Sequence, residues 1–228
     1  LAYADVLAYV GMAHWYLGEL DAAQAGFDAA SAVLLRAQKL APRDPTLLFQ
    51  LSAIDNNAGH VLEGRGRVDE ASTHYRRMLG TAQELVAVDA GNVDWQNQLG
   101  LAHNNLAKMA LLRGDLKGAI TGYRADVAIE AALARRDARN NAQVERLLLA
   151  QGALGRTLAM AGEDSEGAAL LQSAFDAAEG LHALEPDSAS FAEDIPTYGT
   201  PLAGLRRLRG EEEAARTLLA KSLAITGE

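Results

Sequence analysis

Two asparagine pairs stand 48 residues apart in the sequence, and their chemistry suits the recognition of a peptide backbone. Asn56 and Asn57 form the first pair, and Asn104 and Asn105 form the second. An Asn amide both donates and accepts hydrogen bonds, so it can pair with the N–H and C=O groups of an extended chain. Such pairing depends little on the side chains of the bound chain. The amides therefore predict a peptide-binding surface.

Basic side chains occupy a second set of equivalent positions. His60, Lys108 and Arg156 are also spaced by 48 residues, and the first two each follow an Asn pair by three and four positions. Residues three and four apart are neighbours on a helix surface. Each of these two helices would present an amide pair beside a basic group, which would attract an acidic segment or a carboxylate.

Aromatic residues mark a third set of positions. Trp15 and Tyr16 stand there in the first segment, and together with Met12 they could line a pocket for a small molecule. A plainer interpretation of all three sets is that the polar residues are merely tolerated on a solvated helix face. An Asn could equally satisfy buried backbone groups between helices.

A glycine that recurs every 48 residues indicates the elements that position these side chains. Small residues lie seven before and five after each glycine, and a large apolar or aromatic residue lies nine after it. The glycine suits a tight turn with positive φ, the small residues let two helices approach, and the large residue fills the groove between them. The pattern predicts five helical hairpins. Their glycines are Gly18, Gly66, Gly114, Gly162 and Gly210.

Pro, Gly, Asp and Asn residues between the hairpins predict where the helices begin and end. The fifth hairpin differs, because Pro196 and Pro201 lie inside its first helix, and an interior Pro costs about 3 kcal/mol. We expect that helix to be broken or to begin near Pro201, which suits a first turn. The predicted first helices are 2–17, 46–64, 94–112, 142–160 and 201–209, and the second helices are 20–40, 68–88, 116–136, 165–184 and 212–226.

Composition argues against several classes of function. The net charge of −9 disfavours a general nucleic-acid binder, and the absence of Cys removes disulfides, thiolate chemistry and Cys-based zinc sites. The five His residues show no paired ligand spacing, so we expect neither a metal nor another cofactor. No apolar run approaches the roughly 20 residues that span a bilayer, so direct membrane insertion is not expected. No set of positions gathers a nucleophile, a base and an orienting group, so we expect no enzyme.

The order of small residue, glycine, small residue and large apolar residue resembles the tetratricopeptide repeat (TPR) over essentially the whole chain. The usual TPR has about 34 residues, so this resemblance is to a long, 48-residue variant like those in bacterial signalling proteins. It implies an all-α fold, a right-handed superhelical solenoid of five antiparallel hairpins that forms a single domain, residues 1–228. We expect units at about residues 1–45, 46–93, 94–141, 142–189 and 190–228, as a fragment of a larger protein.

The resemblance also implies a non-catalytic scaffold or sensor module that holds a protein or an extended peptide in a concave groove. Two alternatives stay open: an oligomerisation or assembly module that self-associates through its first or last helix, and a small-molecule sensor domain of a signalling protein. The cytoplasm is favoured, or the periplasm if the chain is attached to a membrane-bound kinase. The residues expected to contact the partner are Trp15, Tyr16, Asn56, Asn57, His60, Asn104, Asn105, Lys108 and Arg156.

Overall fold

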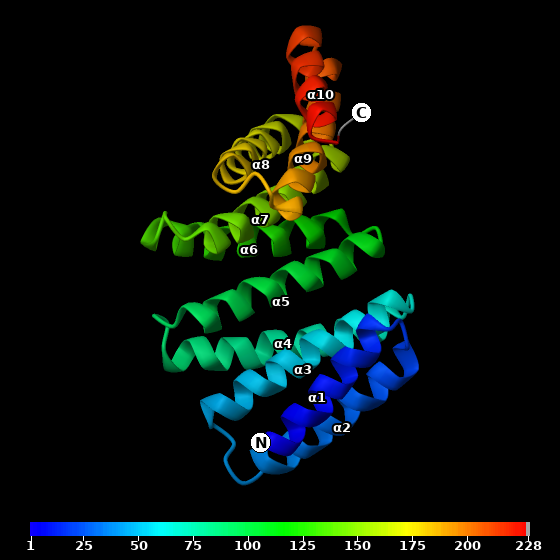
Figure 1. Ribbon diagram of the computed structural model, residues 1–228. Coiled ribbons are helices and arrows are strands. Elements are labelled where there is room, and N and C mark those ends of the chain that lie inside the picture. Colours follow the sequence, from blue (N-terminus) through cyan, green and yellow to red (C-terminus); the bar gives the residue numbers. More distant parts are fainter. Residues whose placement is uncertain (227–228) are drawn as a thin grey trace. The chain divides into compact units, whose positions relative to one another are not determined.

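Ten α-helices and no strand make up residues 1–226, the part of the chain that the computed structural model describes (Figure 1). The all-α prediction is therefore confirmed. The first helices of the hairpins are α1 (Ala2–Tyr16), α3 (Pro45–Gly64), α5 (Val93–Leu112), α7 (Asn141–Met160) and α9 (Ala189–Leu208). The second helices are α2 (Leu20–Gln38), α4 (Val68–Val88), α6 (Leu116–Arg136), α8 (Asp164–Leu184) and α10 (Glu212–Thr226).

The helices fall into two compact units. Unit 1 is Leu1–Gly114 and contains α1 to α5, and unit 2 is Asp115–Glu228 and contains α6 to α10. Within unit 1 each helix packs on the next, and α3 also lies beside α1 and α5. Within unit 2 the same serial packing holds, and α7 lies beside α9. The single domain of five repeat units stays a prediction.

The recurrent glycines have the backbone conformation that the sequence predicts. Each one follows a first helix, and their φ angles lie between 70° and 78°. No other residue type has a positive φ in the described part of the chain. This left-handed conformation is costly for residues with a Cβ. The 48-residue period is thus a period of tight turns.

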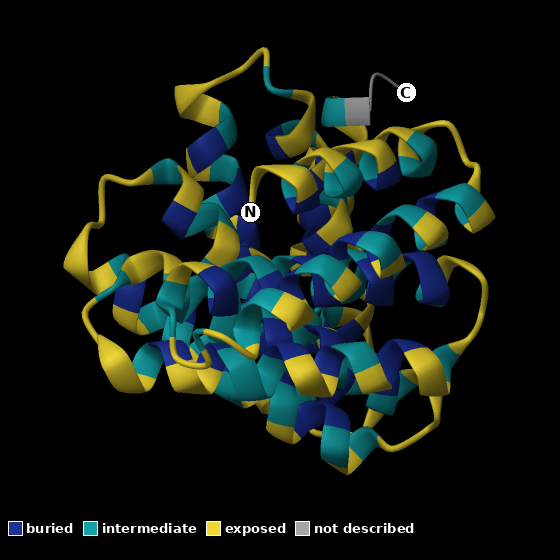
Figure 2. Cartoon of the chain, turned by 90° about the horizontal axis from the view of Figure 1, so that it is seen from below, coloured by how far each residue is buried: buried dark blue, intermediate teal, exposed yellow. Residues whose placement is uncertain are grey.

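Small residues bring the two helices of a hairpin together, as the pattern predicts. A Cβ built on Gly11 would lie 3.0 Å from Cε1 of Phe27, and one built on Gly26 would lie 2.8 Å from Cα of Gly11. The Tyr75 ring packs against Gly59 in the same way in the next hairpin. Phe27 and Tyr75 are both buried, as are residues along the inner face of every helix (Figure 2). Close backbone approach therefore makes room for one large side chain in each hairpin.

Side-chain caps fix where the later first helices begin. Each cap oxygen accepts a hydrogen bond from a backbone N–H three positions ahead, at 3.1 to 3.5 Å, which satisfies a donor that a helix start leaves unpaired. These caps repeat with the same 48-residue spacing as the glycines, and they are Asp44, Asn92, Asn140 and Ser188.

The prediction that the fifth hairpin has a broken first helix is wrong. Helix α9 is continuous from Ala189 to Leu208, although it contains Pro196 and Pro201. Its inner face is buried through Tyr198, Leu202 and their neighbours, and it packs on both α8 and α10. Burial of large side chains, each contributing about 1.5–3 kcal/mol, outweighs the local cost of the two prolines.

Candidate functional site

The first helices of unit 1 bring most of the predicted partner-binding residues onto one face. Helix α3 lies beside both α1 and α5, so side chains from the three helices are neighbours. Arg156 belongs to α7 in unit 2 and is therefore part of a different unit. The predicted residues that belong to α1, α3 and α5 are Trp15, Tyr16, Asn56, Asn57, His60, Asn104, Asn105 and Lys108.

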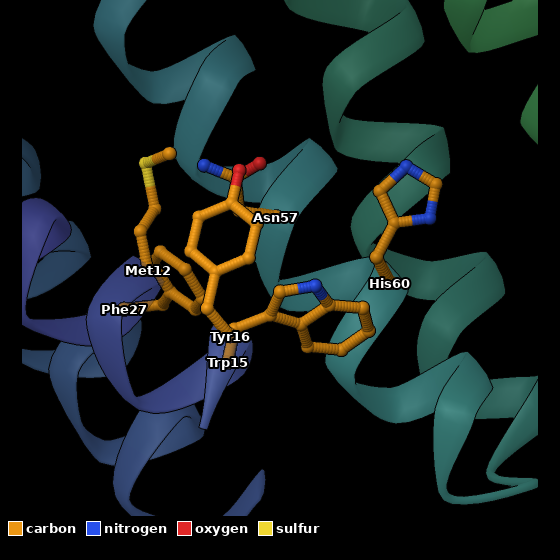
Figure 3. Close-up of a pocket in the computed structure, with 6 residues that line it drawn as sticks. All are labelled: Met12, Trp15, Tyr16, Phe27, Asn57 and His60. Carbon is orange, nitrogen blue, oxygen red and sulfur yellow. The ribbon is translucent and has the colours of Figure 1, made fainter. Parts of the chain in front are cut away.

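A cavity of about 120 Å³ opens between α1 and α3. Figure 3 shows Trp15 and Tyr16, both from α1, together with Asn57 and His60 of α3 around this cavity. Met12 and Phe27 complete its apolar wall. Tyr16 is 80% exposed, whereas Trp15 is half-buried. The predicted aromatic, amide and basic positions thus meet around one opening.

A second cavity of about 190 Å³ continues along the same pair of helices. It shares Met12 and Asn57 with the first cavity, and it also contacts Tyr9 and Gln50. The amide nitrogen of Gln50 donates to Asp5 at 2.9 Å. Its Oε1 atom is buried and accepts no hydrogen bond from the described residues. A buried acceptor without a donor is costly, so a ligand N–H that reached it would be stabilised.

Gln50 is a functional candidate that our reading of the sequence missed. A signal for it exists, because Gln98 occupies the equivalent position 48 residues later. In the structure, however, Gln98 accepts a hydrogen bond from the Ser52 hydroxyl at 3.2 Å. The repeated residue type therefore serves two different purposes, and only the packing around each amide separates them.

The amide pairs are arranged differently from a ladder of equivalent rungs. Asn105 is only 1% exposed, and its amide nitrogen donates to Asn56 Oδ1 at 2.8 Å. Asn56 in turn donates a long hydrogen bond of 3.5 Å to Asn57. Asn104 is half-buried on α5 and does not line either cavity. Asn57 is therefore the amide that lines the cavities. Asn105 is buried and holds Asn56, the neighbour of Asn57, through its hydrogen bond.

A polar network surrounds His60 on the same face. The Tyr75 hydroxyl lies 3.0 Å from His60 Nδ1 and donates to Glu63 Oε2 at 3.1 Å, and Lys108 Nζ lies 2.8 Å from the same carboxylate oxygen. Burial and the nearby Lys108 charge lower the pKa of His60. Burial opposes ionisation of Glu63, but Lys108 and Tyr75 together lower its pKa. Near neutral pH, the network therefore holds an ion pair beside an uncharged imidazole.

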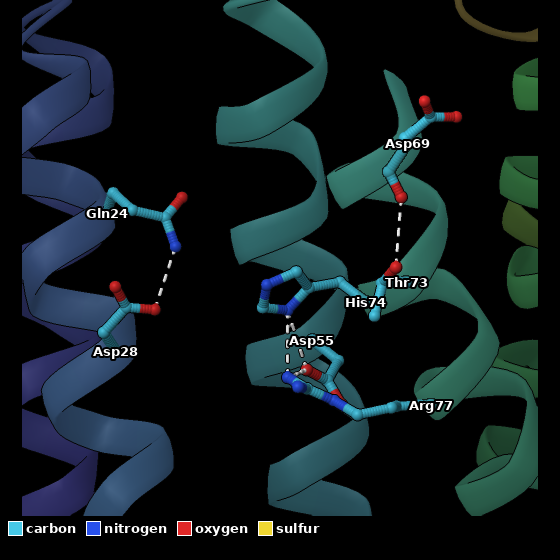
Figure 4. Close-up of polar contacts among 7 residues, drawn as sticks. All are labelled: Gln24, Asp28, Asp55, Asp69, Thr73, His74 and Arg77. Carbon is cyan, nitrogen blue, oxygen red and sulfur yellow. Dashed lines mark hydrogen bonds and ion pairs between the residues drawn. The ribbon is translucent and has the colours of Figure 1, made fainter. Parts of the chain in front are cut away.

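A second polar cluster joins α3 to α4 on another side of α3 (Figure 4). The buried carboxylate of Asp55 lies 2.9 Å from His74 Nδ1 and accepts a hydrogen bond from Arg77 Nε at 3.1 Å. The hydrogen bond to Asp55 raises the pKa of Arg77. Since a buried charge requires such partners, this cluster has a structural explanation within the hairpin.

Arg156 has an aromatic partner within unit 2. Its guanidinium carbon lies 5.7 Å from the centre of the Tyr198 ring, within the range of a cation–π contact. Burial and the neighbouring Asp194 raise the pKa of Tyr198. Arg156 is itself exposed. Its equivalent position in α1 is Met12, a wall of both cavities in unit 1.

Residues 1–226 contain no group of three or more His, Asp or Glu side chains placed to hold a metal ion. Over the same range, no helix combines the length and the apolar character needed to cross a bilayer.

The fold is that of TPR-like repeat proteins, whereas the sequence matches no family model and no curated protein. BtubC (BKLC) from P. vanneervenii has a TM-score of 0.76 and 18% identity, over 99% of this chain and 80% of that one. A Podosopora anserina protein described as a kinesin light chain with nearly identical TPR-like repeats has a TM-score of 0.67 and 18% identity, over 97% of this chain and 93% of that one.

The apo form of RapI also has a similar structure. Its TM-score is 0.70 at 11% identity, over 96% of this chain, which spans about half (52%) of RapI. At such identities the likeness defines the fold alone. The fold is therefore that of a TPR-like helical repeat.

Proposed function

We propose that this chain is a protein-interaction module whose α1–α3 face binds an extended segment of another protein. The pair of adjoining cavities between these helices carries the proposal, because they share Met12 and Asn57 and form one continuous lining. Side chains on one face of an extended segment recur every second residue, about 7 Å apart. Two neighbouring cavities suit two such side chains.

The size of the cavities favours a peptide over a metabolite. Pockets for small molecules usually enclose about 300–1,000 Å³. The cavities here measure about 120 and 190 Å³, which suits single side chains. Their walls contain Met12, Trp15 and Tyr16, so the inserted side chains should be apolar or aromatic.

Polar groups on the walls suit the backbone of such a segment. Asn57 lines both cavities and can both donate and accept, and Gln50 Oε1 offers a buried acceptor for a peptide N–H. Lys108 is already paired with Glu63, and Arg156 already contacts Tyr198. We therefore assign the preference to apolar segments, and the acidic partner remains a prediction from the sequence.

Selection of peptides from a random display library, followed by calorimetry with the selected peptide, tests this function. Tyr16→Ala and Asn57→Ala should each weaken binding tenfold or more, because they remove one wall of the cavity and the amide that meets the backbone. Tyr3→Ala is the matched control, because it removes an exposed tyrosine from the same helix outside both cavities.

Equal affinity of all three variants for the selected peptide would refute the assignment to this face. Failure to select any peptide would count against the function itself. A thermal shift with metabolites but not with peptides would support the alternative of a small-molecule sensor.

A further inference from the structure

The outer face of α1 is apolar and exposed, and it is distinct from the face that lines the cavities. Tyr3 is 66% exposed and Val6 is 56% exposed, and Val10 and Ala13 continue the same stripe. These positions recur every three or four residues, so they share one side of the helix. An apolar stripe of this kind normally packs against another element.

Residues at the equivalent positions of α3 and α9 are buried. They pack against the preceding hairpin, α3 in a cluster with α1 and α2, and α9 in a cluster with α8. The same side of α1 therefore has the chemistry of a packing surface between hairpins. The α3 residues are Leu51, Ile54, Ala58 and Val61, and the α9 residues are Ile195, Tyr198, Leu202 and Leu205.

Helix α10 has the complementary surface. The large residue nine positions after each glycine is buried in the earlier second helices, and Tyr75 of α4 shares a core cluster with Met109 of α5. Leu171 of α8 likewise packs in a cluster with residues of α9. The equivalent residue of α10 is Leu219, and it is 41% exposed.

We propose that α10 of one copy packs on the outer face of α1 in a second copy, which extends the stack of hairpins from one molecule to the next. A second copy is the occupant that the repeat itself specifies, because one chain has both halves of an interface that it already forms internally between α2 and α3 and between α8 and α9. Two different surfaces would meet, so the association grows head to tail or closes as a ring. This proposal is independent of the peptide-binding face.

An ion pair found between neighbouring hairpins of unit 1 makes the proposal specific. An Arg just after a first helix binds an Asp in the first turn of the preceding second helix. The two examples are Arg65 with Asp21 at 2.6 Å and Arg113 with Asp69 at 2.7 Å. Across the proposed contact, the equivalent residues are Leu17 of one copy and Glu213 of the other. Leu17→Arg should complete the pair and strengthen association.

Sedimentation velocity and light scattering over a range of protein concentrations test the contact. The unmodified chain should increase in mass with concentration, and Leu17→Arg should shift this increase to at least threefold lower concentration. Val10→Glu and Leu219→Glu should each abolish growth, with Val6→Glu as a substitute if the Val10 variant does not fold. Leu184→Lys is the control, because it charges another exposed apolar residue outside both surfaces and should leave growth unchanged.

A mixing experiment decides whether the contact joins two different surfaces. Val10→Glu keeps an intact α10 surface, and Leu219→Glu keeps an intact α1 surface. Neither variant should grow alone, but an equimolar mixture should form a one-to-one dimer. A chain that stays monomeric at millimolar concentration, or a mixture without the dimer, would overturn the proposal. Tyr16→Ala should weaken peptide binding but leave this association intact. A failure of the self-association proposal can therefore be told apart from a failure of the peptide-binding proposal.

Discussion

Unit 1 keeps a cavity between α1 and α3, whereas unit 2 fills the equivalent space between α7 and α9. The residues that differ are three repeat periods apart. Ile54 on the cavity wall in unit 1 corresponds to Tyr198 in unit 2, and Ala8 corresponds to Gly152. The Tyr198 ring is 1% exposed and lies against Gly152, where a Cβ would overlap it. Ala8 and Ile54 thus leave a cavity between their helices, whereas Gly152 and Tyr198 fill the corresponding space.

This difference shows which structural features follow from the 48-residue period and which do not. The turns and the close approach of helices recur in both units because the same glycines and small residues recur. The filling of the space between first helices does not recur, because the residues there differ between the two units. Binding surfaces can therefore arise within a constant backbone by changes in a few side chains.

Removal of the side chain that fills unit 2 should have the largest effect on stability. Tyr198→Ala should lower the free energy of unfolding by about 3–5 kcal/mol, the usual cost of removing a buried aromatic ring. Part of α9 should also lose helicity, because that packing holds a helix with two prolines. Urea denaturation followed by circular dichroism measures both effects. Tyr16→Ala, which removes an exposed ring in unit 1, should cost no more than about 0.5 kcal/mol.

The free energy of unfolding should also depend on pH, through a buried carboxyl group of unit 2. Glu130 is buried, and burial together with nearby Asp126 raises its pKa to about 7 from its ordinary value of 4.5. Between these values the folded chain keeps a proton that the unfolded chain has released, so the free energy of unfolding falls as pH rises. The loss reaches about 3 kcal/mol above pH 8, since each pKa unit corresponds to about 1.4 kcal/mol.

Urea denaturation at pH 5 and pH 8 measures this loss. Glu130→Gln should keep the hydrogen-bonding partner of Gln143 as an uncharged amide and should remove most of the slope. Glu166→Gln, an exposed carboxylate on α8, is the control and should leave the slope as it is. If the Glu130→Gln variant kept the slope of the unmodified chain, titration of Glu130 would not be the cause of the pH dependence.

Loss of the buried amide should have a smaller effect, confined to unit 1. Asn105→Ala removes the donor to Asn56 and should lower the free energy of unfolding by about 1–3 kcal/mol. Peptide affinity should fall less than for Asn57→Ala, because Asn105 hydrogen-bonds to Asn56 and does not line a cavity. Thermal unfolding and calorimetry together measure both quantities. A loss of affinity without any loss of stability would instead place Asn105 on the binding surface.

Most of the fold could be predicted from the sequence, because its turns and contacts recur. The glycine period located all five tight turns, and the bounds of nine helices were predicted to within two residues. Helix α9 could not be predicted, because the local cost of Pro196 and Pro201 is visible in the sequence and the packing that offsets it is not. Local rules are reliable here only where tertiary contacts do not oppose them.

The candidate site was less predictable, because equivalent positions need not be equivalent in environment. Asn57 and Asn105 both belong to the repeated amide pairs, yet one lines a cavity and the other is buried behind it. Lys108 appeared available for an acidic partner, and the structure pairs it with Glu63. The sequence shows that a polar residue recurs on a helix face, but not which groups it meets across neighbouring helices.

A transfer of the unit 2 arrangement into unit 1 should have the smallest effect on stability and a large effect on binding. Ala8→Gly combined with Ile54→Tyr places a tyrosine ring over the new glycine, as Tyr198 lies over Gly152. The glycine should cost about 1 kcal/mol in the helix, while the ring fills the cavity of about 190 Å³. Calorimetry with the selected peptide should show at least a tenfold loss of affinity. If the peptide bound the double variant unchanged, the open space between α1 and α3 would not be what separates the two units in function.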